Sequence, residues 1–249
     1  MPSEPARVVI RLAGIRKAFG EKVVLDGLDL EVMKGEILVI LGRSGGGKSL
    51  TLKTIAGFER PDAGTVMAFG QDVLSLDDRE LRRMRRRFGY VFQSGALINW
   101  MTAEENVALP LVEHDAGTPA EIRERVRATL AQVDLADAGA LYPDQMSGGM
   151  RKRAALARAL IQEPNAILYD EPTTGLDPIT SSHIDRLVLS TRERTGLTSL
   201  VISHDLDSTF RIADRVAVLH AGRIVACGPP EEVRASDVPA VRRFLGAQP

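Results

Sequence analysis

Short apolar runs alternate with amphipathic stretches along most of the chain. Apolar runs bounded by turn residues are typical of buried strands, whereas apolar residues at a helical spacing are typical of amphipathic helices. The strands that these runs predict are residues 7–15, 23–25, 28–33, 37–41, 64–69, 88–92, 166–169, 199–202, 216–219 and 224–226. The pairs Asp26-Gly27 and Lys34-Gly35 predict turns, so a small antiparallel sheet should lead into a parallel one.

Capping signals mark the starts of several helices. Asp77 with Glu80 and Thr118 with Glu121 are in capping-box register, and Ser147 is a favourable N-cap residue. The predicted helices cover residues 77–87, 118–134 and 147–162, begin near 178 and 206, and include one or two short helices within 233–245. Strands and helices alternate along most of the chain, which is the pattern of an α/β protein. A helical insert in the middle of the chain interrupts this α/β core.

This order of elements predicts a single domain over residues 1–249. Its α/β core, with an antiparallel β subdomain, should occupy residues 1–92 and 164–228, and the helical insert residues 93–163. Residues 229–249 should form a C-terminal helical tail. A content of 44% hydrophobic and 26% charged residues is enough to bury a substantial core.

The charge balance, the cysteine content and the apolar runs exclude several classes of protein. A net charge of −1 does not indicate a nucleic-acid partner. The single cysteine, Cys227, cannot form an internal disulfide and is expected to be a small apolar filler. Apolar runs are far shorter than the roughly 18 residues of a membrane span, and the first residues have no apolar signal segment. We therefore expect a cytoplasmic protein.

The most informative segment fits the phosphate-binding pattern GxxxxGK[ST] and directly follows the apolar run 37–41. Its glycines let backbone N–H groups surround a polyphosphate, and the helix that follows adds its positive end. Lys48 should reach the β- and γ-phosphates, while the Ser49 hydroxyl should bind Mg²⁺. The alternative is a glycine-rich turn without a ligand. The predicted ATP contacts are Gly42, Arg43, Ser44, Gly45, Gly46, Gly47, Lys48, Ser49 and Leu50.

Two carboxylates end the apolar strand at residues 166–171, as in a Walker B element. Asp170 is predicted to hold Mg²⁺ through water molecules. Glu171 is predicted to polarise the water that attacks the γ-phosphate. The competing interpretation of two acids after a strand is a solvent-exposed helix cap.

Residues 146–150, Met-Ser-Gly-Gly-Met, precede a basic and alanine-rich helix, and they resemble the signature of ABC-type ATPases. The usual form is LSGGQ, so the chain departs from it at Met146 and Met150. The resemblance implies a P-loop NTPase (RecA-like) fold, bound ATP and Mg²⁺, and a head-to-tail homodimer. In that dimer Ser147, Gly148 and Gly149 present helix N–H groups to a γ-phosphate on the other protomer.

Further residues follow in the order of the family's motifs. By resemblance, Gln93 is the Q-loop glutamine that contacts the Mg²⁺ shell, and Asp177 is the D-loop aspartate that reaches across the dimer. His204 resembles the H-loop histidine on the γ-phosphate. Phe19 stands where an aromatic residue stacks on adenine, although such a ring is more often part of a core. Leu50 stands where these P-loops often carry a hydroxyl residue that helps to hold the α-phosphate. Backbone amides can still bind the phosphates without that hydroxyl.

Residues 92–97, 147–150, 153–159 and 177–180 together look like the ATPase of Mla-type, MCE-associated lipid transporters. The resemblance implies a peripheral subunit on the cytoplasmic side of the inner membrane. Its expected partners are a multi-span permease, an MCE-domain protein and a small STAS-domain protein. The expected cargo is phospholipid or a related hydrophobic molecule moving between the envelope membranes.

Two other functions remain open at this point. An ABC ATPase of a polar-solute transporter shares all these motifs, as does a non-transport ABC ATPase that signals to a partner complex. A generic P-loop kinase does not explain the glycines after Ser147, nor His204. Trp100 fits either a permease contact or the insert's interior, and the arginine-rich run 82–87 fits a solvated helix face better than a phosphate site.

Overall fold

Two β-sheets form the framework of the computed structural model, which describes residues 7–246. One sheet is four-stranded and antiparallel in the order β2-β1-β4-β5. Its strands are β1 (Val8–Phe19), β2 (Lys22–Met33), β4 (Ala63–Ala68) and β5 (Gln71–Asp72). The other sheet has six strands in the order β10-β9-β3-β8-β7-β6, and all neighbouring pairs are parallel except β9 with β10. Its strands are β3 (Ile37–Gly42), β6 (Phe88–Val91), β7 (Ala166–Asp170), β8 (Thr198–Ser203), β9 (Arg215–His220) and β10 (Arg223–Gly228).

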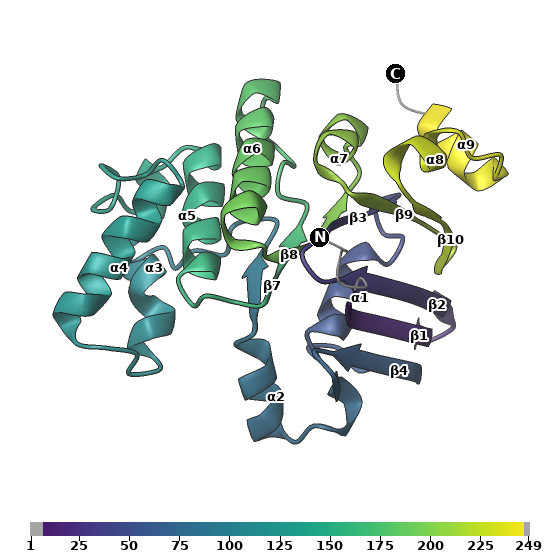
Figure 1. The fold of residues 1–249 in the computed structure, drawn as a ribbon, viewed down its shortest axis with the longest axis horizontal. Helices are drawn as coiled ribbons and strands as arrows, with labels where there is room; N and C mark the ends of the chain where they lie inside the picture. Colours follow the sequence, from purple (N-terminus) through teal and green to yellow (C-terminus); the bar gives the residue numbers. More distant parts are fainter. Residues whose placement is uncertain (1–6, 247–249) are drawn as a thin grey trace, which may run out of the picture.

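Helices cover both faces of the parallel sheet. They are α1 (Lys48–Ile55), α2 (Asp78–Arg85), α3 (Ala103–Val112), α4 (Pro119–Gln132), α5 (Gly148–Leu160), α6 (Pro178–Thr195), α7 (Leu206–Ile212), α8 (Pro230–Arg234) and α9 (Pro239–Gly246), with short 3₁₀ turns at Val73–Ser75 and Pro143–Gln145. Figure 1 shows the insert helices α3 and α4 on one side of the molecule and the tail helices α8 and α9 on the other.

Every residue of strands β3, β7 and β8 is buried, because helices or the second sheet pack on both of their faces. Alternate side chains enter different apolar clusters. Val39 of β3 joins a cluster with the insert helices, whereas Ile40 joins a second cluster with α1 and the antiparallel sheet. Since these strands are parallel, the P-loop, the Walker B acids and the segment after β8 all emerge at one edge of the sheet.

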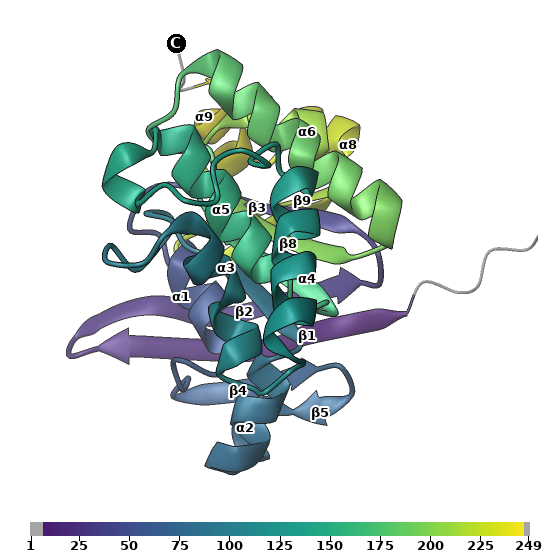
Figure 2. The same ribbon diagram turned by 90° about the vertical axis from the view of Figure 1, so that its left-hand side faces the viewer.

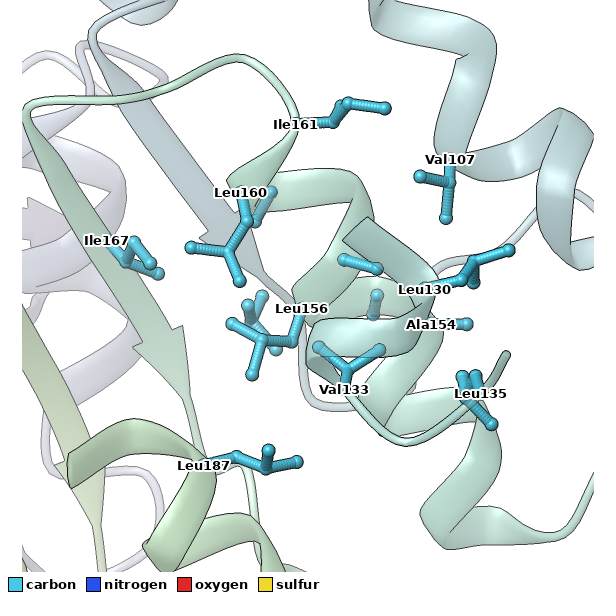
Figure 3. Close-up of a cluster of buried hydrophobic side chains, with 14 of the residues drawn as sticks. Val107, Leu130, Val133, Leu135, Ala154, Leu156, Leu160, Ile161, Ile167 and Leu187 are labelled. Atoms are coloured by element: carbon cyan, nitrogen blue, oxygen red, sulfur yellow. The ribbon is translucent and has the colours of Figure 1, made fainter. Parts of the chain in front are cut away.

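One apolar cluster joins the helical insert to the sheet. Figure 3 shows Val107 of α3, Leu130 of α4 and Leu156 of α5 in the same group as Ile167 of β7 and Leu187 of α6. The insert helices lie together in Figure 2, and Figure 1 shows α5 between α3 and α4 on one side and the strands on the other. The insert therefore has no separate core and shares the one that covers the parallel sheet.

The structure corrects the predicted turn at Asp26-Gly27, because β2 is a single strand. The turn of this hairpin lies instead at Gly20-Glu21. Gly27 has a left-handed φ of 77°, and the pairing skips it: Ile15 faces Leu28 and Arg16 faces Asp26. The pair therefore forms a β-bulge, which the Asp26 N–H stabilises by donating to the Gly222 carbonyl at 3.0 Å.

Three other details differ from the expectations. Helix α3 has no counterpart among the predicted helices, although Thr102 and Glu105 form a capping box at its start. Cys227 is exposed rather than an apolar filler, and its Sγ lies 3.2 Å from a guanidinium nitrogen of Arg215. Of the tail helices, α8 begins at Pro230, before the predicted range of 233–245, and α9 begins at Pro239, inside it.

The arginine-rich run is divided between solvent and structure. Arg82, Arg83 and Arg86 are exposed, as expected for a solvated helix face. The Arg85 guanidinium donates to the carbonyls of Ala56 and Gly57 at the end of α1, at 3.1 and 2.6 Å. Part of the run thus caps the helix that follows the P-loop.

Candidate nucleotide site

The P-loop is a tight backbone cradle between β3 and α1. Gly45 and Gly47 have left-handed φ values of 72° and 101°. A Cβ on Gly47 would lie 2.8 Å from a methyl of Leu25, so the loop passes too close to β2 for a side chain. Lys48 is buried, and its Nζ donates to the Gly42 and Arg43 carbonyls at 2.8 and 3.2 Å. Free N–H groups of the first turn of α1 and this ammonium together suit a polyphosphate.

Next to the loop, a hydroxyl and a carboxylate meet. The Ser49 Oγ donates to Asp170 Oδ1 at 3.1 Å, which joins the first turn of α1 to the end of β7. Burial raises the pKa of Asp170, and the neighbouring Glu171 carboxylate adds to this, while the Ser49 hydrogen bond opposes it. Oxygen donors of this kind fit Mg²⁺, which binds few protein groups and completes its shell with phosphate and water.

The Glu171 carboxylate is the centre of the site. Its Oε2 accepts from Thr174 Oγ1 at 3.0 Å and from Gln93 Nε2 at 3.3 Å, and lies 3.3 Å from His204 Nδ1. Its Oε1 lies 3.5 Å from Lys48 Nζ. Burial acts to raise the pKa of Glu171. The Thr174 hydrogen bond and the charges of Lys48 and His204 lower this pKa by more than burial raises it, so the net shift is downward. The group is therefore a carboxylate at neutral pH, as its predicted role as a base requires.

A cavity of about 470 Å³ lies over the P-loop. Its lining includes Phe19 and Leu50 together with Lys48, Ser49, Gln93 and Glu171. The Phe19 ring is 53% exposed, so it is not a core residue. The arrangement is compatible with an adenine on that ring, a role that stays a prediction.

The predicted signature and D-loop residues lie together but apart from this cavity. Ser147 Oγ accepts from the Met150 N–H at 3.2 Å and caps α5. Asp177 caps α6 by accepting from the N–H groups of Ile179 and Thr180, both at 3.0 Å. A Cβ on Gly149 would lie 2.4 Å from the Thr180 methyl, so the two helix starts pack closely. None of these residues lines the phosphate cavity of its own chain.

Two residues at the site escaped the sequence analysis. Thr174 lies three residues after Glu171, a spacing that allows a hydroxyl to turn back onto the carboxylate. Lys152 lies on the buried face of α5, and its Nζ donates to the Gln93 carbonyl and, at 3.2 Å, to the Glu171 carbonyl. The one available signal was that Lys152 shares a helical face with Gly149 and Leu156, an unusual place for a lysine.

Fold and site together define a P-loop nucleoside triphosphatase. The chain belongs to the ABC transporter family, whose model matches residues 25–174. A methionine import ATP-binding protein, MetN, of Brucella abortus is 43% identical over 236 residues, covering 94% of this chain and 63% of that protein. A probable ribonucleotide transport ATP-binding protein, mkl, of Mycobacterium tuberculosis is 38% identical over 244 residues, covering 98% of this chain and 68% of that protein.

Solved structures confirm the predicted fold class. An ATP-binding cassette in a dimeric post-hydrolysis state with ADP and Pi superposes with a TM-score of 0.81 at 34% identity, covering 89% of this chain and 98% of that one. The structure of cbiO1 from Clostridium perfringens, part of an ABC transporter complex, gives a TM-score of 0.84 at 27% identity, covering 97% and 95%. The chain is thus an ABC-type ATPase that binds ATP. Within residues 7–246 no helix has the length and apolarity to cross a membrane.

Proposed function

We propose that the chain powers an ABC transporter that moves phospholipid or a related hydrophobic molecule between the inner and outer envelope membranes. The supporting observation is the variant signature, in which Met150 replaces the usual glutamine. Met150 is half-buried and packs against the apolar cluster of the insert, while its N–H donates to Ser147. An apolar residue is therefore an integral part of this signature, as in the Mla-type ATPases that the sequence resembles.

The partners proposed with this function are a second copy of the chain, a multi-span permease, an MCE-domain protein and a small STAS-domain protein. The chain would be peripheral, on the cytoplasmic side of the inner membrane. The proposed dimer is supported by the similar ATP-binding cassette that was solved in a dimeric state with ADP and Pi. In this chain Ser147, Gly148, Gly149 and Asp177 do not line the cavity over the P-loop. A head-to-tail partner would bring them to the γ-phosphate.

The proposed chemistry is electrostatic and positional. Lys48 and the P-loop amides would bind the β- and γ-phosphates, and Glu171 would orient the attacking water and draw its proton. His204, in contact with Glu171, would complete the polar surround of the γ-phosphate. Ser49, Asp170 and Gln93 would hold Mg²⁺, which neutralises phosphate charge when it is bound.

A second candidate is the import of a polar solute. It is favoured by the names of two relatives, which specify methionine and ribonucleotide transport. The shared motifs bind nucleotide and do not contact cargo, so the two candidates predict the same site and differ in their partners.

The partners and cargo are tested by purifying the tagged chain from gently solubilised native membranes. Mass spectrometry should then identify a permease, an MCE-domain protein and co-purified phospholipid. Recovery of a permease with a solute-binding protein would favour the polar-solute candidate. Recovery of soluble proteins alone would contradict both transport functions. Adding the candidate cargo to the purified complex provides a second readout, because only the true cargo should stimulate ATP hydrolysis.

A further inference from the structure

Lys152 is a buried lysine whose ammonium contacts two motifs at once. It lies in the second turn of α5 and is 6% exposed. Its Nζ donates to the backbone carbonyl of Gln93 in the Q-loop and to that of Glu171 at 3.2 Å. Burial of an ammonium is costly unless its donors are satisfied. Burial lowers the pKa of Lys152, although Asp170 and Glu171 act to raise it.

The Glu171 backbone needs support, because this residue has a left-handed φ of 49°. For a residue other than glycine such a conformation is strained and persists only where neighbours hold it. The Glu171 N–H donates to the Ile202 carbonyl at 3.0 Å, and its carbonyl also accepts from the Thr174 N–H at 3.3 Å. Among these contacts, Lys152 alone comes from the helix that carries the signature.

The contacts of Lys152 form a closed ring with the site. Lys152 holds the Gln93 carbonyl, and the Gln93 side-chain amide donates to the Glu171 carboxylate at 3.3 Å. Helix α5 is itself packed tightly on β6, since a Cβ on Gly89 would lie 3.0 Å from Ala159. A displacement of α5 would therefore move the Q-loop and the backbone of Glu171 together.

We propose that Lys152 is a positioning residue for ATP hydrolysis: it holds Glu171 and the Q-loop in register with the signature helix, so that Glu171 is aligned only when α5 is in place. This inference rests on the proposed role of Glu171 as the base. Lys152 does not line the cavity over the P-loop, and it acts through the backbone of Glu171 and through Gln93.

The first test compares Lys152→Met with Lys152→Arg, which keeps the charge and the donors. We expect Lys152→Met to lower kcat by about tenfold or more, equivalent to about 1.4 kcal/mol in the barrier. The Kd for ATP should stay within about twofold, because the P-loop is untouched, and Lys152→Arg should recover most of the rate. The matched control is Arg153→Gln, one residue along α5, which loses guanidinium bonds to the Val133 and Asp134 carbonyls but none to the site.

The decisive measurement repeats Lys152→Met in a Glu171→Gln background by single-turnover hydrolysis. If Lys152 acts through Glu171, its substitution should cost almost nothing once that carboxylate is gone. The same loss in both backgrounds, or a rise in Kd that matches the fall in rate, would overturn the proposal. So would an unchanged kcat in Lys152→Met. An unchanged rate in Glu171→Gln alone would instead overturn the proposed base, so the two failures are distinguishable.

Discussion

Four side chains from different parts of the chain surround one carboxylate, Glu171. Gln93 follows β6, Thr174 follows Glu171 itself, His204 follows β8, and Lys48 opens α1. Each is a donor or a cation, which explains why the pKa of this half-buried acid is lowered despite its burial. The arrangement aims an ionised carboxylate at the cavity above the P-loop.

Replacing Glu171 by glutamine should remove water activation and leave the binding groups in place. We expect kcat to fall by about 10² to 10⁴ and the Kd for ATP to change little, which should trap an ATP-bound dimer. Phosphate release, nucleotide binding and size-exclusion chromatography measure these effects. Glu163→Gln, at a carboxylate that is 84% exposed, is the control and should keep the wild-type rate. Unchanged turnover in Glu171→Gln would refute the assigned base.

Ser49 gives a second prediction at this scale. Ser49→Ala removes the hydroxyl that now donates to Asp170, and with it one proposed Mg²⁺ ligand. The Mg²⁺ concentration for half-maximal hydrolysis should rise by about tenfold or more, in line with typical effects of altered metal sites. Ser49→Thr retains the hydroxyl and should behave like the wild type. A magnesium titration that is the same for all three proteins would argue against Ser49 as a ligand.

Among the secondary-structure elements, the starts of α5 and α6 pack closely on each other. Gly149 faces Thr180, whose Oγ1 donates to Asp177 Oδ2 at 2.5 Å and is thereby fixed. The signature and the D-loop of one chain are thus packed against each other. A change at one helix start must move the other.

The close packing of Gly149 against Thr180 predicts that a larger residue at position 149 destabilises the protein. A smaller residue at position 180 should restore the stability. In Gly149→Ala the new Cβ would lie 2.4 Å from the Thr180 methyl, and overpacking of this kind typically costs about 1–3 kcal/mol. Urea unfolding should show that loss, together with a lower rate of hydrolysis. The double variant Gly149→Ala with Thr180→Ser deletes the clashing methyl and keeps the hydroxyl. It should recover most of the stability, and a failure to do so would mean that Gly149 serves another purpose.

The elements that are predicted best from the sequence are those whose signals lie within a few neighbouring residues. Strands β3 and β7 are short apolar runs followed by a glycine loop or by acids, and both lie where expected. Helix α3 was missed because Pro110 interrupts its apolar spacing. The Asp26-Gly27 bulge was misinterpreted because the Gly222 carbonyl that accepts from the Asp26 N–H is nearly two hundred residues away. Lys152 was missed for a similar reason, since the backbone carbonyls that it holds cannot be inferred from the residue types.

On the scale of the whole molecule, the insert carries an exposed tryptophan close to the Q-loop. Trp100 is 81% exposed, so of the two interpretations of this residue, burial in the insert is wrong and a permease contact stays a prediction. A large exposed aromatic ring is a common anchor in protein interfaces. It lies seven residues after Gln93, whose side-chain amide donates to the Glu171 carboxylate.

Trp100→Ala should therefore weaken assembly and leave the isolated ATPase intact. We expect unchanged basal hydrolysis and a loss of about 2 kcal/mol or more in binding to the permease, as for interface hot spots. Co-purification from membranes and titration with the detergent-solubilised permease measure this loss. Val112→Ala, at an exposed insert position, is the control. Permease binding that survives Trp100→Ala unchanged would place the interface elsewhere.

The strand order has a consequence for synthesis on the ribosome. Strand β3, which leads into the P-loop, is hydrogen-bonded to β8 on one side and β9 on the other, and both are made more than 150 residues later. Until then a fully apolar strand has no partner in its sheet and must be kept from pairing with other chains. The nucleotide cradle is thus among the first segments translated and among the last assembled, so a nascent chain cannot bind ATP until nearly all of it has emerged.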